Sequence, residues 1–347
     1  MYKRKDHHYV PQFYLRNFSS NDSRNCVNLY NLKQGKLIPQ VSIKEQAKEK
    51  YLYGEDDIIE SKLSEIESST APIIKRIIET ERFGSQDDKD QVLRFIMYQY
   101  SRIVHREKLM KQQMSALWGT ELDDPIMNKG LSVKEMVEMV EEQLPYLQFL
   151  DLLLLKNSTD IPFITSDNPV VLYNHLMEKN ASMVSAGWAN KGLQVIIPLS
   201  PDYTLLAYDI FMYKPDKVVS GKDIVRVREQ EVKQLNGLQY INAAKNLFFD
   251  ESMDLEIVKT YIEQYQVKRR EMQEPRLISL GSFRLVIGPE IRINLNITGC
   301  KLSMAGRRYR RNNRMAEFRH DDFERYRASR DKTVEGFMED IRKGNSQ

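Results

Sequence analysis

The hydrophobic pattern of this chain changes its period near residue 145. Before that point, apolar residues recur at helical spacing, and Ser85 and Ser132 each open a capping-box pattern, which marks the start of a helix. The pattern predicts helices over about 56–82, with Pro72 as a kink or break, over 85–118 and over 132–145. After it, short apolar runs separated by Asn, Asp, Gly and Pro predict strands at 146–156, 162–173, 193–199 and 203–213.

The segments on either side of this change complete a fold of the α+β class. Residues 26–42 alternate apolar and polar positions around a turn that contains Gly35, which is the pattern of a β-hairpin. Later segments predict helices at 221–246 and 252–273 and a strand pair at 277–286 and 290–297. We therefore expect an N-terminal segment with a β-hairpin, a helical middle and an antiparallel sheet with C-terminal helices.

The domain organisation follows from the same pattern. Residues 1–300 are expected to form a single compact α+β domain, helical over about 55–145 and mainly β over about 146–300. Residues 301–347 lose the apolar periodicity and are expected to form a basic C-terminal appendage.

The composition favours a soluble protein. The 347 residues include 52 Lys and Arg, 49 Asp and Glu, and 41% hydrophobic residues, which suits a chain with a sizeable core. Cys26 and Cys300 are the only cysteines, so the sequence excludes a disulfide framework and a cysteine-based zinc site. No apolar run approaches the ~18 residues that a membrane helix needs. We expect a cytoplasmic protein with no membrane contact, and the sequence leaves its oligomeric state open.

The densest group of chemically active side chains lies near the N-terminus, in the string HHYVPQFYLRNF at residues 7–18. His7 and His8 would point to opposite faces of a strand, so only one of them easily faces a given site. With Gln12 close by, a neutral imidazole there could bind a divalent metal ion or act as a base. The alternative, at even odds, is that the histidine bonds to local backbone and the aromatic residues anchor the terminus to the core.

The same string resembles the opening signature of a bacterial family known as domain of unknown function 4238. The strings FITSDNPV at 163–170 and PLSP at 198–201 agree with it, and the similarity spans roughly residues 6 to 250. The resemblance implies a shared architecture and a shared site, but it supplies no reaction. His-His-x-x-Pro is also similar to the start of ββα-metal (HNH) nucleases, although the next histidine, His105, is too distant to complete that compact site.

Two predicted helices carry polar residues beside their apolar stripes. Glu60 and Glu67 lie at the edge of the first stripe, where two carboxylates suit metal ligation or acid–base chemistry. The commoner alternative is a solvated edge that pairs with lysines of the same helix. On the next helix Arg102 could clamp a phosphate or carboxylate, or it could be the buried partner of Glu60 or Glu67.

A third candidate is the turn between two apolar runs at Ser166, Asp167 and Asn168. In the functional interpretation, Asp167 is a metal ligand or acid–base group at a strand end, and its two neighbours donate hydrogen bonds. In the structural interpretation, which we favour for a generic Ser-Asp-Asn-Pro, the side chains stabilise the turn by bonding to their own backbone. A serine nucleophile is disfavoured because no nucleophile elbow surrounds Ser166.

The net charge of +3 conceals one strongly basic segment. Residues 301–330 carry a charge of +6, which leaves the rest of the chain near −3. Within that segment, arginines alternate with an aromatic residue, a mixture that binds nucleic-acid backbone and stacks on bases, at Arg307, Arg308, Tyr309, Arg310 and Arg311. A solvated tail without a specific partner is the equal alternative.

The leading hypothesis from the sequence is a single polar pocket between the helical part and the sheet. It would contain His7 or His8, Gln12, Glu60, Glu67, Arg102 and the Ser166–Asn168 turn, and would act as a metal-assisted phosphodiesterase or nuclease. In that hypothesis His8, Glu60 and Asp167 are the ligands of Mg²⁺ or Mn²⁺, and nucleic acid is the substrate. A role in antiviral defence rests on association alone. The alternative is a non-enzymatic binding protein whose polar cluster is structural and whose arginine tail contacts nucleic acid or an acidic partner.

Overall fold

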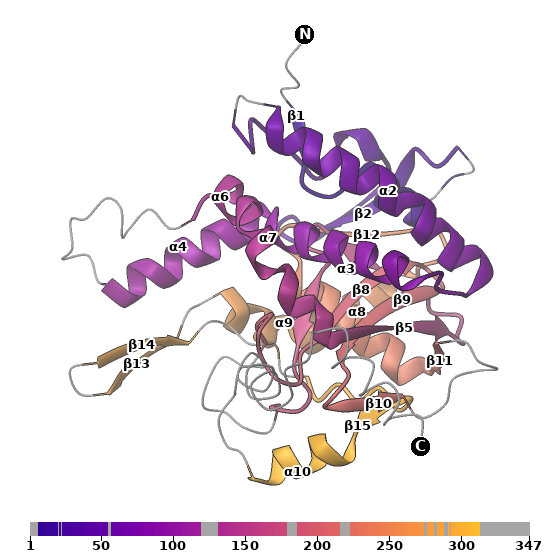
Figure 1. The fold of residues 1–347 in the computed structure, drawn as a ribbon. Coiled ribbons are helices and arrows are strands. Elements are labelled where there is room, and N and C mark those ends of the chain that lie inside the picture. Colours follow the sequence, from indigo (N-terminus) through magenta and orange to yellow (C-terminus); the bar gives the residue numbers. More distant parts are fainter. Residues whose placement is uncertain are drawn as a thin grey trace.

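Helices cover both faces of a five-stranded sheet in the computed structural model of the chain (Figure 1). The structure describes residues 6–19, 21, 23–54, 57–118, 131–178, 186–215, 223–273, 276–280, 283–287, 291 and 293–312. The α-helices are α1 (Gln12–Leu15), α2 (Ile58–Thr80), α3 (Gln86–Ser101), α4 (Val104–Trp118), α6 (Val133–Glu138), α7 (Val140–Gln143), α8 (Glu229–Asn242), α9 (Leu255–Gln273) and α10 (Met304–Asn312). The 3-10 helices in these ranges are η1 (Arg16–Phe18), η2 (Ile43–Glu45) and η3 (Leu144–Phe149).

Within the described residues, the strands form two larger sheets and three two-stranded ones. The five-stranded sheet has the order β11 (Ile224–Val227), β5 (Leu150–Asn157), β9 (Tyr203–Asp209), β8 (Gln194–Ser200), β7 (Val171–Tyr173). The four-stranded sheet has the order β3 (Lys36–Ser42), β2 (Cys26–Asn31), β12 (Asn246–Phe249), β6 (Thr165–Ser166). The pairs are β1 (Asp6–His8) with β4 (Lys48–Lys50), β10 (Tyr213–Pro215) with β15 (Cys300–Leu302), and β13 (Arg276–Leu280) with β14 (Phe283–Ile287).

The five-stranded sheet is buried on both faces, which explains its nearly continuous apolar strands. Alternate residues of β5 point to opposite sides: Leu152 and Leu154 join the apolar cluster of α2 and α3, and Leu153 and Leu155 join that of α8 and α9. Strands covered on both faces need apolar residues at every position, as in the run Leu152–Leu155. The sheet therefore separates two cores, one under the helical part of the chain and one under the C-terminal helices.

The N-terminal segment joins these layers. In α1, the buried Tyr14 donates its hydroxyl hydrogen to the Pro198 carbonyl oxygen of β8 at 2.7 Å, and the same hydroxyl lies 2.7 Å from Thr165 Oγ1 of β6. Strand β2 of the hairpin pairs with β12, which pairs in turn with β6. The N-terminal string is thus fixed against both larger sheets at once.

Several predictions from local pattern are confirmed. The fold is α+β, the hairpin forms as β2 and β3 with Gly35 at φ +61° in its turn, and Ser85 and Ser132 both form complete capping boxes. The break that the sequence offered as one alternative at Pro72 does not occur. Helix α2 is continuous through that residue, which lies on the exposed side, where water can bond to the carbonyl group that the ring leaves without a donor.

Other predictions are wrong. The expected helix over 85–118 is two helices, α3 and α4, which are separated at Arg102 and Ile103. The expected helix over 221–246 begins as β11 and ends before β12, so the helical part is only α8. In the five-stranded sheet the strands expected within 146–213 pair antiparallel, as expected, and β11 adds one parallel edge strand beside β5. The strand pair near the C-terminus is the hairpin of β13 and β14, and the described residues of 290–297 form no strand.

Part of the basic segment packs on the fold as α10. Gly306 is buried, and a Cβ atom there would lie 2.2 Å from the Met212 carbonyl oxygen. Arg310 donates to the carbonyl oxygens of His175 and Leu176, and Lys191 lies over the Tyr309 ring. The remaining residues of the segment, 313–347, lie outside the described residues. Among the described helices, none is long and apolar enough to cross a membrane.

Candidate functional site

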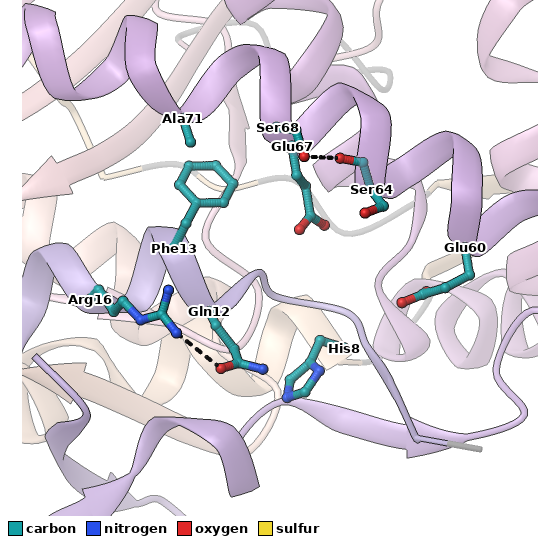
Figure 2. Close-up of a pocket in the computed structure, with 9 residues that line it drawn as sticks. All are labelled: His8, Gln12, Phe13, Arg16, Glu60, Ser64, Glu67, Ser68 and Ala71. Carbon is teal, nitrogen blue, oxygen red and sulfur yellow. Dashed lines mark hydrogen bonds between the residues drawn. The ribbon is translucent and has the colours of Figure 1, made fainter. Parts of the chain in front are cut away.

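A pocket of about 350 Å³ opens between the N-terminal segment and α2 (Figure 2). We call it the α1–α2 pocket. From α2 it is lined by Glu60, Ser64, Glu67, Ser68 and Ala71. From the N-terminal segment it is lined by His8, Gln12, Phe13 and Arg16. Figure 2 shows the two carboxylates reaching into the hollow from α2, with His8 and Gln12 on the opposite side.

The helical repeat explains how α2 supplies one wall of this pocket. Its lining residues follow one another at helical spacing, so they share one face of the helix. The neighbouring face, with Ile59, Leu63 and Ile66, is buried in the core and fixes the rotation of the helix. Glu60 and Glu67 are therefore held at the boundary between core and solvent, and each is partly buried.

The two adjacent histidines have different surroundings. His7 is 1% exposed, its ring stacks on Tyr53 with 5.2 Å between centroids, and its Nδ1 accepts a hydrogen bond from the Tyr53 backbone N–H at 3.3 Å. His8 is half-buried, and its Nε2 lies 3.0 Å from the Lys44 carbonyl oxygen. A carbonyl oxygen can only accept, so Nε2 carries the hydrogen and Nδ1 is the basic nitrogen of a neutral His8. Of the pair, His8 therefore suits proton transfer and His7 has a packing role.

Gln12 and Arg16 lie one turn apart on the segment of α1 and η1. Arg16 Nη2 donates to Gln12 Oε1 at 3.4 Å (Figure 2). Arg16 is exposed, so its guanidinium group can turn toward an anion that enters the pocket. Arg16 was not among the site residues expected from the sequence. Its signal was the spacing of four residues from Gln12 on one short helical segment.

Behind this wall, Arg102 is fixed by a polar network. Its side chain is 2% exposed, and its Nη1 donates to Glu67 Oε1 at 2.6 Å. Its Nε donates to Gln99 Oε1 at 2.8 Å, and Gln99 Nε2 donates to the Tyr9 carbonyl oxygen at 2.9 Å. Of the two roles considered for Arg102, the structure shows the buried partner, and the partner is Glu67.

Asp167 does not line the α1–α2 pocket. Its Oδ1 accepts from the Ala244 backbone N–H at 2.7 Å, and its Oδ2 accepts from Lys245 and Asn246 at 2.8 and 3.2 Å. Burial raises the pKa of Asp167 to about 6, against these three backbone donors and Arg269, which favour the carboxylate. The side chain thus fastens the connection between α8 and β12.

The residues next to Asp167 are also bonded within the fold. Ser166 Oγ donates to Gln239 Oε1 at 2.9 Å, and Asn168 Nδ2 donates to the Asn242 carbonyl oxygen at 2.9 Å. Both acceptors belong to α8, so this turn holds the helix against β6. The roles are structural, but the partners differ from the expected ones: the side chains bond to α8 and to the residues after it, and only the bond from the Asn168 backbone N–H to Ser166 Oγ, at 3.3 Å, lies within the turn itself.

The metal ligands expected from the sequence lie at two different pockets. His8 and Glu60 line the α1–α2 pocket, and Asp167 lines a different one. Over the residues that the structure describes, no three His, Cys, Asp or Glu side chains are grouped closely enough to hold a metal ion. What the α1–α2 pocket offers is an imidazole, two carboxylates, an amide and a guanidinium group, which suits acid–base chemistry on a substrate that carries negative charge.

The basic residues expected to bind nucleic acid lie together on α10. Arg307, Arg308 and Arg311 are exposed, whereas Tyr309 and Arg310 are half-buried through their packing contacts. Three arginines of this helix therefore remain at the surface.

Comparison with known proteins gives one match. No curated protein and no solved structure matches the chain. A family model described as "Protein of unknown function (DUF4238)" matches residues 6–252, a span that holds the whole α1–α2 pocket, and the chain therefore belongs to that family.

Proposed function

We propose that the α1–α2 pocket hydrolyses phosphodiester bonds, with nucleic acid as the substrate. The observation that carries the proposal is the meeting of His8 with Glu60 and Glu67 in one open pocket beside Arg16. His8 Nδ1 is the base that activates water, and Glu60 protonates the leaving oxygen. Arg16 binds the phosphate by its planar fork.

The buried arginine supports this division of roles. Two carboxylates beside a phosphate would repel it, but the charge of Glu67 is matched by Arg102 at 2.6 Å. Glu60 is thus the carboxylate that we assign to proton transfer, and Glu67 with Arg102 forms the wall behind it. The roles given to His8, Glu60 and Arg16 do not require a metal ion, and one held by Glu60 together with the substrate phosphate would assist the same reaction.

The test is cleavage of single-stranded RNA, single-stranded DNA and duplex DNA by the full chain, with Mg²⁺, with Mn²⁺ and with a chelator. We expect His8→Gln and Glu60→Gln to lose at least about 100-fold of the rate without a change in melting temperature. Glu65→Gln, at an exposed position of the same helix, is the matched control. Equal rates in all four proteins would contradict the proposal, and dependence on Mn²⁺ or Mg²⁺ would add a metal ion to it.

A second candidate function is nucleic-acid binding without catalysis. It is favoured by the exposure of Arg307, Arg308 and Arg311 on one helix and by the structural bonding of Arg102 and Asp167. Because α10 packs on the fold through Gly306, point variants test this better than deletion of the segment. Replacing the three arginines by alanine should abolish salt-sensitive RNA or DNA binding, whereas unchanged binding would dismiss the role.

A further inference from the structure

A second pocket, larger than the first, opens beside the start of α4. It has a volume of about 680 Å³, within the range of small-molecule sites. Ile103, Val104 and Leu109 give it an apolar side, and the ring of Tyr9 lies at the same pocket. His105, Lys108 and Lys245 give it a polar side. We call it the α4 pocket.

The α4 pocket is separate from the α1–α2 pocket. His8 lines one and its neighbour Tyr9 the other, and the hydrogen bond from Gln99 to the Tyr9 carbonyl oxygen lies in the wall between them. Arg102 contacts Glu67 of the first pocket, whereas Ile103 lines the second. A ligand of the α4 pocket is therefore independent of the hydrolysis proposed above.

Several cations lie at or near the α4 pocket: Lys108 and Lys245 line it, and Arg106 and Arg269 also act on His105. Over the part of the chain that the structure describes, neither Lys108 nor Lys245 forms an ion pair with a carboxylate, and Arg269 donates to backbone carbonyl oxygens of residues 240–244. Arg106 stacks on the Tyr100 ring at 3.3 Å and donates to the Val170 carbonyl oxygen. A concave surface next to several cations attracts anions.

The acidic groups of the pocket reduce this charge only in part. Asp167 is already bonded to three backbone N–H groups, and Glu49 of β4 is exposed at the pocket. The first turn of α4 adds to the positive side, because Val104 and His105 belong to the N-terminal end of a helix of 15 residues.

The pKa of His105 is affected by these nearby cations. Burial, together with Arg106, Arg269, Lys108 and Lys245, lowers the pKa of His105 to about 4. Two of these cations, Lys108 and Lys245, line the pocket, and Asp167, Glu49 and Tyr9 line it from the end of β6, from β4 and from the N-terminal segment. The imidazole is therefore neutral at pH 7, where its N–H can donate to an anion.

We propose that the α4 pocket binds a small organic phosphate of about mononucleotide size. Its phosphate group is held by Lys108 of α4 and by Lys245 of the connection between α8 and β12, and its base lies against Tyr9, Ile103 and Leu109. The half-apolar wall favours a ligand with a planar organic part over an inorganic ion.

Titration calorimetry on the full chain tests this proposal, with adenosine monophosphate, adenosine, ribose 5-phosphate and inorganic phosphate as the probes. We expect adenosine monophosphate to bind tightest, and adenosine to bind at least about tenfold more weakly, because it lacks the charged group. Binding should weaken as salt is added, since both lysines are exposed. No heat with any of the four probes at millimolar concentration, or equal affinity for adenosine and its monophosphate, would overturn the proposal.

Variants locate the site. Lys108→Gln and Lys245→Gln should each weaken adenosine monophosphate binding about three- to tenfold. Lys111→Gln is the matched control, because Lys111 lies on the same helix but pairs with Glu107. Glu60→Gln should bind normally, which separates failure of this site from failure of the hydrolytic one.

The His105 imidazole gives a second readout that does not depend on the variants. Followed by NMR, its pKa should rise when adenosine monophosphate binds, because a nearby negative charge stabilises the imidazolium form. An unchanged His105 pKa in the saturated protein would place the ligand elsewhere and refute the assignment.

Discussion

Removal of the Glu67 carboxylate should destabilise the protein strongly, although Glu67 itself is partly exposed. The reason lies in Arg102, whose side chain is 2% exposed and whose charge is matched by Glu67 at 2.6 Å. In Glu67→Ala the buried guanidinium group of Arg102 still donates to Gln99, but it has lost the carboxylate that balances its charge. Breaking a buried pair from one side costs about 3–5 kcal/mol. The side chain of Glu67 is 28% exposed, so water can partly replace it, and we expect the lower end, about 3 kcal/mol.

Urea unfolding measures this cost as a shift of the transition midpoint at constant slope. Glu65→Ala is the control, because Glu65 lies on the same helix at an exposed position and should change the free energy of unfolding by less than about 0.5 kcal/mol. The double variant Glu67→Ala with Arg102→Met should be more stable than Glu67→Ala alone, because it leaves no unpaired buried charge. If Glu67→Ala matches Glu65→Ala, the reasoning about Arg102 is refuted.

Three further outcomes are expected. Asp167→Asn should lower the free energy of unfolding by about 3 kcal/mol, because an amide nitrogen would face backbone donors. Asp160→Asn, at an exposed position, is the control and should change it little; equal melting temperatures of the two variants would contradict this. Gly237→Ala should lower the melting temperature, since its Cβ would lie 2.3 Å from the Tyr265 ring; an unchanged value would show that α9 can yield. Hydrogen bonds from lysine, tyrosine and arginine lower the pKa of Glu141 to about 2, although burial opposes them. The stability that the Glu141 carboxylate contributes should therefore be lost as the pH falls from 4.5 to 2. Over that range the melting temperature of the parent protein should approach that of Glu141→Gln.

Features encoded over a few neighbouring residues could be predicted from the sequence. The capping boxes at Ser85 and Ser132 and the hairpin turn at Gly35 depend on side chains within four positions of one another, so their pattern is visible without the fold. Strands β11 and β12 have four residues each and are stabilised by partners far away in the chain. Such short strands leave no periodic signal of their own.

The break between α3 and α4 shows the same limit. Neither Gly nor Pro marks it, and the apolar pattern continues across it. Arg102 is the C-cap residue of α3, and its side chain bonds to Glu67 of α2, 35 positions earlier, a contact that the local pattern does not contain. Similarly, the sequence marked Asp167 as a candidate site residue, but the backbone N–H groups that bond to its carboxylate lie 77 to 79 positions later. The choice between a structural and a catalytic aspartate depends on those distant donors.

The N-terminal string carries so many polar and aromatic residues because it meets several parts of the fold within a few positions. His7 stacks on Tyr53, His8 lines one pocket, Tyr9 lines the other, and Tyr14 bonds to strands of both larger sheets. Alternation along an extended segment turns each neighbour toward a different environment. A family signature of this kind therefore mixes groups that hold the layers together with groups that face a ligand. Only the second kind, with His8 first among them, can take part in the reaction that we propose, and the string by itself therefore identifies no reaction.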